Sequence, residues 1–207
     1  MHVAFLSGGK DSYYAIYRSG IQVDIGLVLV YDFPRPSPHL VNLGKTVETI
    51  LLMGIPVAVV KLGKGREFVE TVGFLRSLGV DTIIAGDVYI EDHLRYMENI
   101  AKEVGAALVE PLWGMDPEDL LYKEIEDGLK PMVIGCVNGL GKWLGVVLDR
   151  DNVYAFAENA KSIGVDPLGE KGEYHTIVLS GPLHKASLSY KIVDVENYDG
   201  YKILRLI

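Results

Sequence analysis

The chain has 207 residues, which is enough for one large or two small domains with a sizeable core. Its composition of 49% hydrophobic and 23% charged residues is typical of a globular protein and excludes a disordered chain. The formal net charge of −8 argues against nucleic acid as the main partner, and no apolar run approaches the roughly 20 residues that span a bilayer.

The first residues and the cysteine content bear on the compartment of the protein. The N-terminus lacks the basic flank and apolar region of a signal peptide, so we expect a cytoplasmic location without membrane attachment. The single cysteine, Cys136, excludes an intramolecular disulfide and a cysteine-based zinc cluster. Because Cys136 lies in an apolar run, we expect it to be a buried hydrophobic side chain.

The chain begins with an apolar run at residues 3–6 that leads directly into Ser7-Gly8-Gly9-Lys10-Asp11-Ser12, here called the phosphate loop. This order predicts a strand, a tight turn and the start of a helix. The two glycines let backbone N–H groups approach an anion, and the helix N-terminus adds partial positive charge. The serines and the lysine supply further donors, and Asp11 or Ser12 can cap the helix. Phosphate binding is predicted, with a glycine-rich turn before an ordinary helix as the alternative.

The spacing of the phosphate loop differs from the two common phosphate-binding patterns, G-x-x-x-x-G-K-[ST] and G-x-G-x-x-G. It resembles the S-G-G-x-D-S loop of the ATP pyrophosphatases, enzymes that cleave ATP between its α and β phosphates and transfer AMP to a substrate. The resemblance implies that ATP is the cofactor and that residues 7–12 bind it.

Strand and helix signals alternate regularly along the first half of the chain. Strands are predicted at residues 3–6, 24–31, 57–60, 82–85 and 107–109, and helices after the phosphate loop and at about 40–54, 68–79 and 92–105. Strands separated by helices and short loops predict a doubly wound, five-stranded parallel α/β sheet. We expect residues 1–110 to form this ATP-binding domain, and the resemblance implies an adenine nucleotide alpha hydrolase-like fold.

The segment at residues 32–38 contains three prolines and is predicted to be a loop, because proline is unfavourable within helices and central strands. Two interpretations stay open. The segment is either a stiff surface connection or a lid beside the nucleotide, since functional residues often lie in loops at strand ends.

The pair Gly86-Asp87 follows the predicted strand at 82–85. Ligands of doubly wound sheets bind at the carboxyl ends of the strands, so this pair is expected to face the same crevice as the phosphate loop. Asp87 suits a Mg²⁺ ion that bridges the phosphates of ATP, a ribose hydroxyl, or the N-terminus of the next helix. The predicted magnesium ligands are Asp11 and Asp87.

The regular alternation of predicted strands and helices ends at Glu110-Pro111-Leu112-Trp113-Gly114, which is the predicted domain boundary. Residues 111–207 are expected to form a smaller C-terminal α/β domain that binds the substrate and ends in two antiparallel strands. Its predicted elements are helices at 116–128 and 152–164, strands at 132–137, 177–179, 188–195 and 201–206, and a glycine-rich loop at 138–142.

A second polar segment, predicted as a loop, is Gly169-Glu170-Lys171-Gly172-Glu173-Tyr174-His175-Thr176, here called the C-terminal motif. Two carboxylates, an imidazole and a hydroxyl within this short segment suit metal binding, the binding of an amine or proton transfer. The alternative is a solvated turn that leads into a hairpin. The five histidines of the chain do not form a metal-ligand spacing, and only His175 is a candidate site residue.

The order of these motifs resembles the diphthine–ammonia ligase family over essentially the whole chain. The matching segments are the phosphate loop, Gly86-Asp87 with Glu98-Asn99, Pro111-Leu112-Trp113 and the C-terminal motif. The resemblance implies amidation of diphthine, the modified histidine of elongation factor 2, to diphthamide. It also implies that ATP is converted into AMP and pyrophosphate while the carboxylate is activated.

The resemblance further implies roles for individual residues. The phosphate loop and Gly86-Asp87 would bind ATP and stabilise the departing pyrophosphate. The predicted catalytic residues, which would hold ammonium, remove its proton or contact the substrate, are Glu170, Glu173 and His175. The predicted substrate-binding residues are Thr176 and Asn138.

Free ammonium is the expected nitrogen donor. Glutamine-dependent synthetases need a nucleophilic cysteine to release ammonia, whereas the second residue here is His2 and Cys136 lies in an apolar run. Ammonium is therefore an expected partner, and the resemblance implies elongation factor 2 bearing diphthine as the other. No nucleic acid and no membrane are expected as partners. The sequence is compatible with a homo-oligomer.

The chain departs from the usual pattern of the family at Lys171, Leu94 and Val146. These departures concern the acceptor side of the site. Two alternatives therefore accompany the ligase: a divergent relative that adenylates another carboxylate, and a nucleotide-binding module without transfer chemistry.

Overall fold

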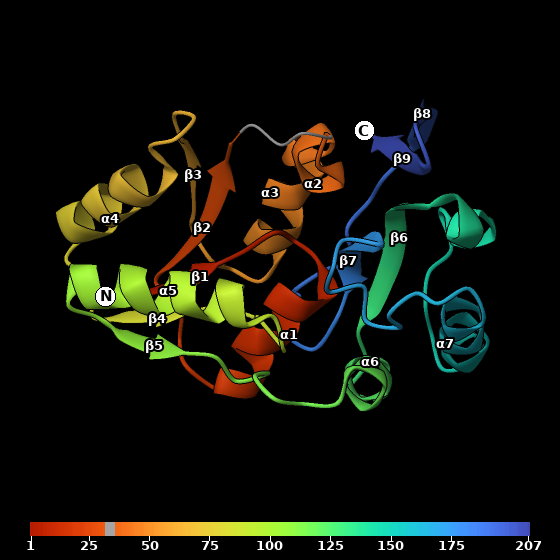
Figure 1. The fold of residues 1–207 in the computed structure, drawn as a ribbon, viewed down its shortest axis with the longest axis horizontal. Coiled ribbons are helices and arrows are strands. Elements are labelled where there is room, and N and C mark those ends of the chain that lie inside the picture. Colours follow the sequence, from red (N-terminus) through yellow and green to blue (C-terminus); the bar gives the residue numbers. More distant parts are fainter. Residues whose placement is uncertain (32–35) are drawn as a thin grey trace.

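Two sheets organise the computed structural model, which describes residues 1–31 and 36–207 (Figure 1). The first half of the chain forms a five-stranded sheet and the second half a four-stranded sheet. Among the described residues, no helix is both long and apolar enough to cross a membrane.

The first sheet has the strand order β3-β2-β1-β4-β5, and all neighbouring strands are parallel. Its strands are β1 (His2–Phe5), β2 (Ile25–Val30), β3 (Val57–Lys61), β4 (Thr82–Ile84) and β5 (Ala107–Val109). In chain order, β2 and β3 are added on one side of the central strand β1, and β4 and β5 are then added on its other side. The predicted doubly wound parallel sheet is therefore confirmed.

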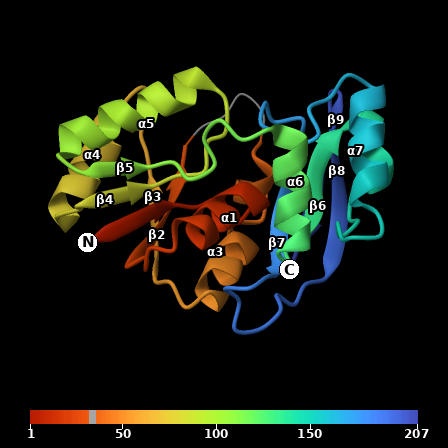
Figure 2. The same ribbon diagram turned by 90° about the horizontal axis from the view of Figure 1, so that it is seen from below.

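Helices cover both faces of this sheet (Figure 2). One face carries α1 (Lys10–Ser19) and α3 (Leu43–Leu52), and the other carries α4 (Glu67–Leu78) and α5 (Glu91–Val104). Successive residues of a strand point to opposite faces. Val3 accordingly packs in the cluster of α4 and α5, whereas Ala4 packs in the cluster of α1 and α3. Because both faces of the sheet are buried, the sequences of these strands are continuous apolar runs.

The second sheet is antiparallel and has the order β7-β6-β9-β8. Its strands are β6 (Lys130–Val137), β7 (Tyr174–Ser180), β8 (Ile192–Tyr198) and β9 (Tyr201–Leu206). The helices α6 (Pro117–Glu126) and α7 (Val153–Ser162) share one core with β6 and β7. The predicted C-terminal α/β unit with an antiparallel ending is thus observed.

The two sheets are joined through α1 and β7. Tyr13 and Tyr14 of α1 are buried in the core of the second half, together with Val178 of β7. The backbone N–H of Val178 donates to the carbonyl of Gly8 at 3.0 Å, and Thr49 Oγ1 donates to the carbonyl of Val178 at 2.5 Å. The phosphate loop is therefore held directly by a strand of the second sheet.

The proline-rich segment predicted as a loop at 32–38 differs from the structure at its end. Pro38 is the first residue of a short helix, α2 (Pro38–Val41), because the fixed φ of proline suits the first helical position. The helix predicted over 40–54 is divided between α2 and α3, with Asn42 between them. Residues 32–35, on which the lid interpretation depends, lie outside the described residues.

Three further elements of the second half were predicted with wrong bounds. Tyr174, His175 and Thr176 belong to β7 and not to a loop, because they pair with Cys136, Gly135 and Val133 of β6. The predicted loop at 138–142 is a 3₁₀ helix, η1 (Asn138–Trp143). The strand predicted from residue 188 begins at Ile192.

Cys136 lies in β6 and is fully buried, as predicted. Burial raises the pKa of its thiol to about 11, so the thiolate is disfavoured at neutral pH. Cys136 therefore has the properties of a structural side chain.

Candidate active site

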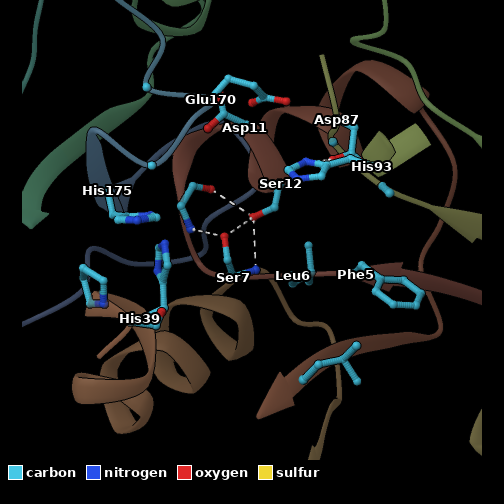
Figure 3. A pocket seen from close by; sticks show the side chains of 18 of the residues that line it. Phe5, Leu6, Ser7, Asp11, Ser12, His39, Asp87, His93, Glu170 and His175 are labelled. Atoms are coloured by element: carbon cyan, nitrogen blue, oxygen red, sulfur yellow. Dashed lines mark hydrogen bonds and ion pairs between the residues drawn. The ribbon is translucent and has the colours of Figure 1, made fainter. Parts of the chain in front are cut away.

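A cleft of about 1090 Å³ lies at the carboxyl ends of β1, β2 and β4, where it faces β7. This is the edge at which doubly wound sheets bind ligands. Four segments of the chain meet in the cleft: the phosphate loop, the loop after β4, the C-terminal motif and α2 (Figure 3). Two motifs about 160 positions apart in the sequence are therefore brought into one site.

The phosphate loop is held in shape by its own serines. Ser12 Oγ donates to the carbonyl of Gly9 at 3.1 Å and lies 3.2 Å from Ser7 Oγ, and the backbone N–H of Ser7 donates to Ser12 Oγ at 3.3 Å. Gly8 has a φ of 77°, which favours glycine, and its missing side chain leaves room for Thr49. The fold of the loop thus depends on small and hydroxyl-bearing residues.

The N-terminus of α1 opens toward the cleft. Gly9 is the N-cap residue and makes no side-chain cap bond, whereas Thr176 of β7 accepts the backbone N–H of Lys10. The prediction that Asp11 or Ser12 caps the helix is therefore wrong, because α1 begins at Lys10 and Ser12 bonds the loop carbonyl of Gly9 instead. The partial positive charge of the helix end is left to attract an anion.

Lys10 lines the cleft but its ammonium is engaged in ion pairs. Nζ lies 2.5 Å from Asp11 Oδ1 and 3.6 Å from Glu124 Oε2 of α6. Burial by itself lowers the pKa of Lys10, but the attraction of the two carboxylates outweighs this effect and raises it above its usual value. A contact of Lys10 with phosphate stays a prediction.

A group of acidic residues with one histidine, here called the acid cluster, lies on one side of the phosphate loop (Figure 3). Asp87, His93 and Glu170 each offer a ligand atom, and these atoms lie within 4.8 Å of one another. Asp87 Oδ1 is 3.3 Å from His93 Nδ1, and this hydrogen bond raises the pKa of His93. Of the two neighbours of Asp87, Glu170 was a predicted site residue, whereas His93 of α5 was not indicated by the sequence.

Two glutamates hold the loop after β4. Glu170 accepts the backbone N–H of Val88 at 3.0 Å, and Glu110 accepts that of Asp87 at 3.2 Å. Burial and the charge of Asp11 raise the pKa of Glu170 to about 7. Burial and the charge of Asp87 raise the pKa of Glu110 to about 8. Carboxyl groups held this closely favour a proton or a bound cation, so the acid cluster fits Mg²⁺ or ammonium by its oxygen donors and charge.

Two histidines, His39 and His175, lie on the other side of the phosphate loop (Figure 3). Their rings meet edge to face with centroids 5.2 Å apart. His39 is buried and belongs to α2, directly after the proline-rich segment. The sequence did not indicate His39 because its only local signal is a lone histidine near a helix start.

The structure brings most of the predicted site residues together. Those that line the cleft are Ser7, Gly9, Lys10, Asp11, Ser12, Gly86, Asp87, Glu170, His175 and Thr176. Gly86 permits close packing, since a Cβ there would lie 3.0 Å from the carbonyl oxygen of Asp11. Thr176 Oγ1 accepts the backbone N–H of Lys10 at 3.1 Å, so it supports the phosphate loop from β7.

Three predicted site residues lie outside the lining of the cleft as far as the chain is described. Gly8 is buried beneath the loop, where its carbonyl accepts the N–H of Val178. Glu173 Oε2 accepts the backbone N–H of Lys171 at 3.0 Å. Asn138 is exposed at the start of η1. Their functional roles stay predictions.

The remaining wall of the cleft is apolar. It is formed by side chains from the ends of β1 and β2 and from α5, including Leu6, Val28, Leu29, Tyr31 and Met97. Such a surface suits the flat face of an aromatic base. These residues were predicted only as strand and helix core.

Two family models match the chain. The model described as the diphthamide synthase N-terminal domain matches residues 1–108, and the model described as the diphthamide synthase C-terminal domain matches residues 116–203. The two matches together cover most of both sheets.

Several curated proteins described as diphthine–ammonia ligase are similar to the chain. The human protein is 34% identical over 113 residues, which cover 53% of this chain and 42% of the human protein. The bovine protein is 33% identical over 113 residues, which cover 53% of this chain and 42% of the bovine protein. The rat protein is 32% identical over 217 residues, which cover 89% of this chain and 80% of the rat protein. The matches to the human and bovine proteins thus span less than half of their lengths.

Among solved structures, the chain is similar to a predicted subunit of tRNA methyltransferase from Methanocaldococcus jannaschii. The TM-score is 0.43 at 13% identity, over 88% of this chain and 97% of the other. A likeness this distant does not bear on function.

Proposed function

Because the chain belongs to the diphthamide synthase family, we propose that it is an ATP-dependent ligase that amidates the diphthine of elongation factor 2 with ammonium. The carboxylate of diphthine would attack the α-phosphate of ATP, which forms an acyl adenylate and releases pyrophosphate. Ammonia would then attack the acyl carbon, which forms the amide and releases AMP. The observation that carries the proposal is the meeting of the phosphate loop and the C-terminal motif in one cleft.

The phosphate loop is suited to the first step. Backbone N–H groups at the open N-terminus of α1, together with the hydroxyls of Ser7 and Ser12, would bind the phosphates and stabilise charge on the departing pyrophosphate. The apolar wall beside it would receive the adenine base. ATP would thereby lie with its α-phosphate between the loop and the C-terminal motif.

Magnesium fits the acid cluster by the chemistry of its donors. Asp87 would hold the ion through a carboxylate oxygen, with Asp11 close by in the same cleft. When bound, Mg²⁺ would neutralise negative charge on the phosphates of ATP.

Glu170 is the better placed of the two glutamates predicted to hold ammonium. It lines the cleft, whereas Glu173 lies outside the lining and accepts the N–H of Lys171. A carboxylate with a pKa of about 7 is a stronger base than an ordinary glutamate. We assign to Glu170 the binding of ammonium and the removal of its proton during attack on the acyl adenylate.

The proposal is tested by incubating the protein with ATP, Mg²⁺, ammonium and elongation factor 2 that carries diphthine. Release of AMP and pyrophosphate that requires the factor, with conversion of its carboxylate to an amide seen by mass spectrometry, is expected. Release with another carboxylate alone would assign the chain to a divergent relative. ATP binding without turnover would show a nucleotide-binding module.

A further inference from the structure

His39 is a buried histidine of the cleft to which the reaction above assigns no role. Its side chain lines the cleft although only 9% of its surface is exposed. Within the described ranges, Nδ1 is buried and has no hydrogen-bond partner. The other ring nitrogen, Nε2, is not among the buried atoms without a partner. A buried ring nitrogen without a partner costs stability, so a histidine at this place calls for a functional reason.

The ring of His39 lies against the phosphate loop. A Cβ added to Gly9 would lie 3.3 Å from His39 Cε1 and 3.2 Å from the carbonyl oxygen of Thr176. The φ of Gly9 is −82°, which any residue can adopt. A larger residue at position 9 would therefore press on its neighbours without backbone strain, and the space that glycine leaves is beside the imidazole.

The imidazole of His39 is neutral. Burial, and then the neighbouring His175, lower its pKa to about 3. A neutral imidazole carries one N–H donor and one bare nitrogen. Since Nδ1 has no acceptor beside it, we place the proton on Nε2, at the end of the ring that Figure 3 shows directed from α2 toward His175 and the loop.

The phosphate loop has need of such a donor. The ammonium of Lys10 is engaged by Asp11 and Glu124. Ser12 Oγ donates to the carbonyl of Gly9 and lies 3.2 Å from Ser7 Oγ, and the backbone N–H of Lys10 donates to Thr176 Oγ1. The donors that remain at the loop are therefore the other backbone N–H groups in the first turn of α1. A phosphate at this place would accept one more hydrogen bond from the side on which His39 stands.

We propose that His39 is a phosphate ligand of the cleft, whose Nε2–H donates a hydrogen bond to a phosphate oxygen of the nucleotide held at the phosphate loop. The inference rests on the proposed function, because it takes the ligand to be a nucleoside triphosphate or its product pyrophosphate. It adds a third element, α2, to the phosphate site formed by β1 and α1.

The test uses inorganic pyrophosphate as the probe and measures its affinity by titration calorimetry. His39→Phe keeps a ring against Gly9 and His175 but removes the donor, and we expect it to bind pyrophosphate about 10- to 100-fold more weakly. His39→Gln restores an N–H donor and should recover part of the affinity. Melting temperatures of all variants confirm that they are folded.

His184→Phe is the matched control. His184 is also partly buried, has an Nδ1 without a partner in the described chain, and packs edge to face on Tyr13 with centroids 5.0 Å apart. It does not line the cleft among the residues described. Its pyrophosphate affinity should equal that of the wild type.

The outcomes separate the inference from the proposed function. Wild-type protein that binds neither pyrophosphate nor ATP would refute both. If the wild type binds pyrophosphate and His39→Phe binds it equally well, the role of His39 as a phosphate ligand is refuted, while the proposed function stands. If His39→Phe also loses amidation, His39 is assigned to the acyl acceptor instead. If His39→Phe does not fold, the Nε2 resonance of His39 in wild-type protein decides: a shift on addition of pyrophosphate is expected, and no shift overturns the proposal.

Discussion

Glu170 and Glu110 interact electrostatically at the cleft, yet we assign them different roles. Both accept a backbone N–H from the loop after β4, and both have a pKa raised by burial and by neighbouring carboxylates. Glu170 lines the cleft and is assigned to the chemistry. Glu110 lies behind the loop and holds Asp87 in place.

Glu170→Gln should separate the two chemical steps. The amide cannot take a proton from ammonium, so we expect amidation to fall at least about 100-fold, while factor-dependent release of pyrophosphate is largely kept. Quench-flow measurement of pyrophosphate and amide formation checks this. Glu126→Gln, at an exposed position of α6 away from the cleft, is the control and should amidate like the wild type. Equal loss in both variants, or loss of pyrophosphate release in Glu170→Gln, would contradict the role assigned to Glu170.

The pH dependence of amidation should report the same group. Glu170 acts as a base only when it is ionised, and its pKa is about 7. The rate of amide formation from the acyl adenylate should therefore decrease as the pH falls below about 7. A pH profile of single-turnover amidation measures this, and a flat profile between pH 6 and 8 would speak against Glu170 as the base.

Glu110 should make the fold less stable at alkaline pH. In the folded chain its pKa is raised from 4.5 to about 8, so between these values the folded state binds more protons than the unfolded state. The free energy of unfolding contributed by this group is therefore fully present below about pH 4.5 and is lost as the pH rises through about 8.

Glu110→Gln removes this titration. We expect the variant to gain stability over the wild type between pH 5 and pH 8, by up to about 4 kcal/mol at about 1.4 kcal/mol per pH unit. Urea unfolding at the two pH values measures the difference. The exposed Glu126→Gln serves as the control. A stabilisation of Glu110→Gln that is equal at both pH values would show that the titration of Glu110 is not its cause.

At the scale of elements, α1 is held between the two halves by a buried ion pair. Lys10 of α1 is 1% exposed and Glu124 of α6 is fully buried, with 3.6 Å between Nζ and Oε2. Neither carboxylate oxygen of Glu124 has a hydrogen-bond partner in the part of the chain that is described. Burial raises the pKa of Glu124 well above its usual value, and Lys10 opposes this shift. Removal of either Lys10 or Glu124 would therefore leave the other charged group buried without its ion-pair partner.

Lys10→Met should be destabilising because it leaves a buried carboxyl without its cation. We expect a loss of about 3 kcal/mol in the free energy of unfolding, of which most is recovered in Lys10→Met/Glu124→Leu. Urea unfolding of the two single variants and the double variant measures the coupling. Arg95→Met, which removes an exposed ion pair with Glu91 in α5, should cost less than about 0.5 kcal/mol. Equal costs for Lys10→Met and Arg95→Met would refute a structural role of the buried pair.

Element bounds were best predicted where a glycine ends a helix. The predicted ends Gly79 and Gly105 follow α4 and α5 directly, with positive φ values of 65° and 81°. This conformation is a property of the residue type, so it can be read locally. The strand at Tyr174–Thr176 was missed because its residues are polar, and only pairing with β6 makes them a strand.

At the scale of the whole molecule, the halves share a core and a hydrogen-bonded junction. Tyr13 and Tyr14 lie in the core of the second half, and Val178 and Thr176 bond the phosphate loop. The division into domains at residues 1–110 and 111–207 stays a prediction, which we propose as a division of function between ATP binding and substrate binding.

This junction predicts cooperative unfolding. We expect far-UV circular dichroism, which reports both halves, and the fluorescence of Trp113 and Trp143, which reports the second half, to show one urea transition with the same midpoint. Separate transitions would show that the halves are stable independently of each other. Thr49→Val removes the hydrogen bond that Thr49 Oγ1 donates to the carbonyl of Val178. It should lower the common urea midpoint, because this buried carbonyl oxygen loses a donor.

The sequence by itself predicted most of the strands, the doubly wound parallel sheet of the first half and the position of the phosphate loop after β1. These features depend on periodicity, turn chemistry and short motifs, all of which act between near neighbours in the chain. A common role of this loop and the C-terminal motif in one reaction was implied by the family resemblance and stays a proposal. The tertiary structure decided which side chains face the ligand. It joined Lys10 to Glu124, left Glu173 outside the lining of the cleft and set His39 against the phosphate loop. Burial and charge at these positions come from residues distant in the sequence, so only the folded chain specifies them.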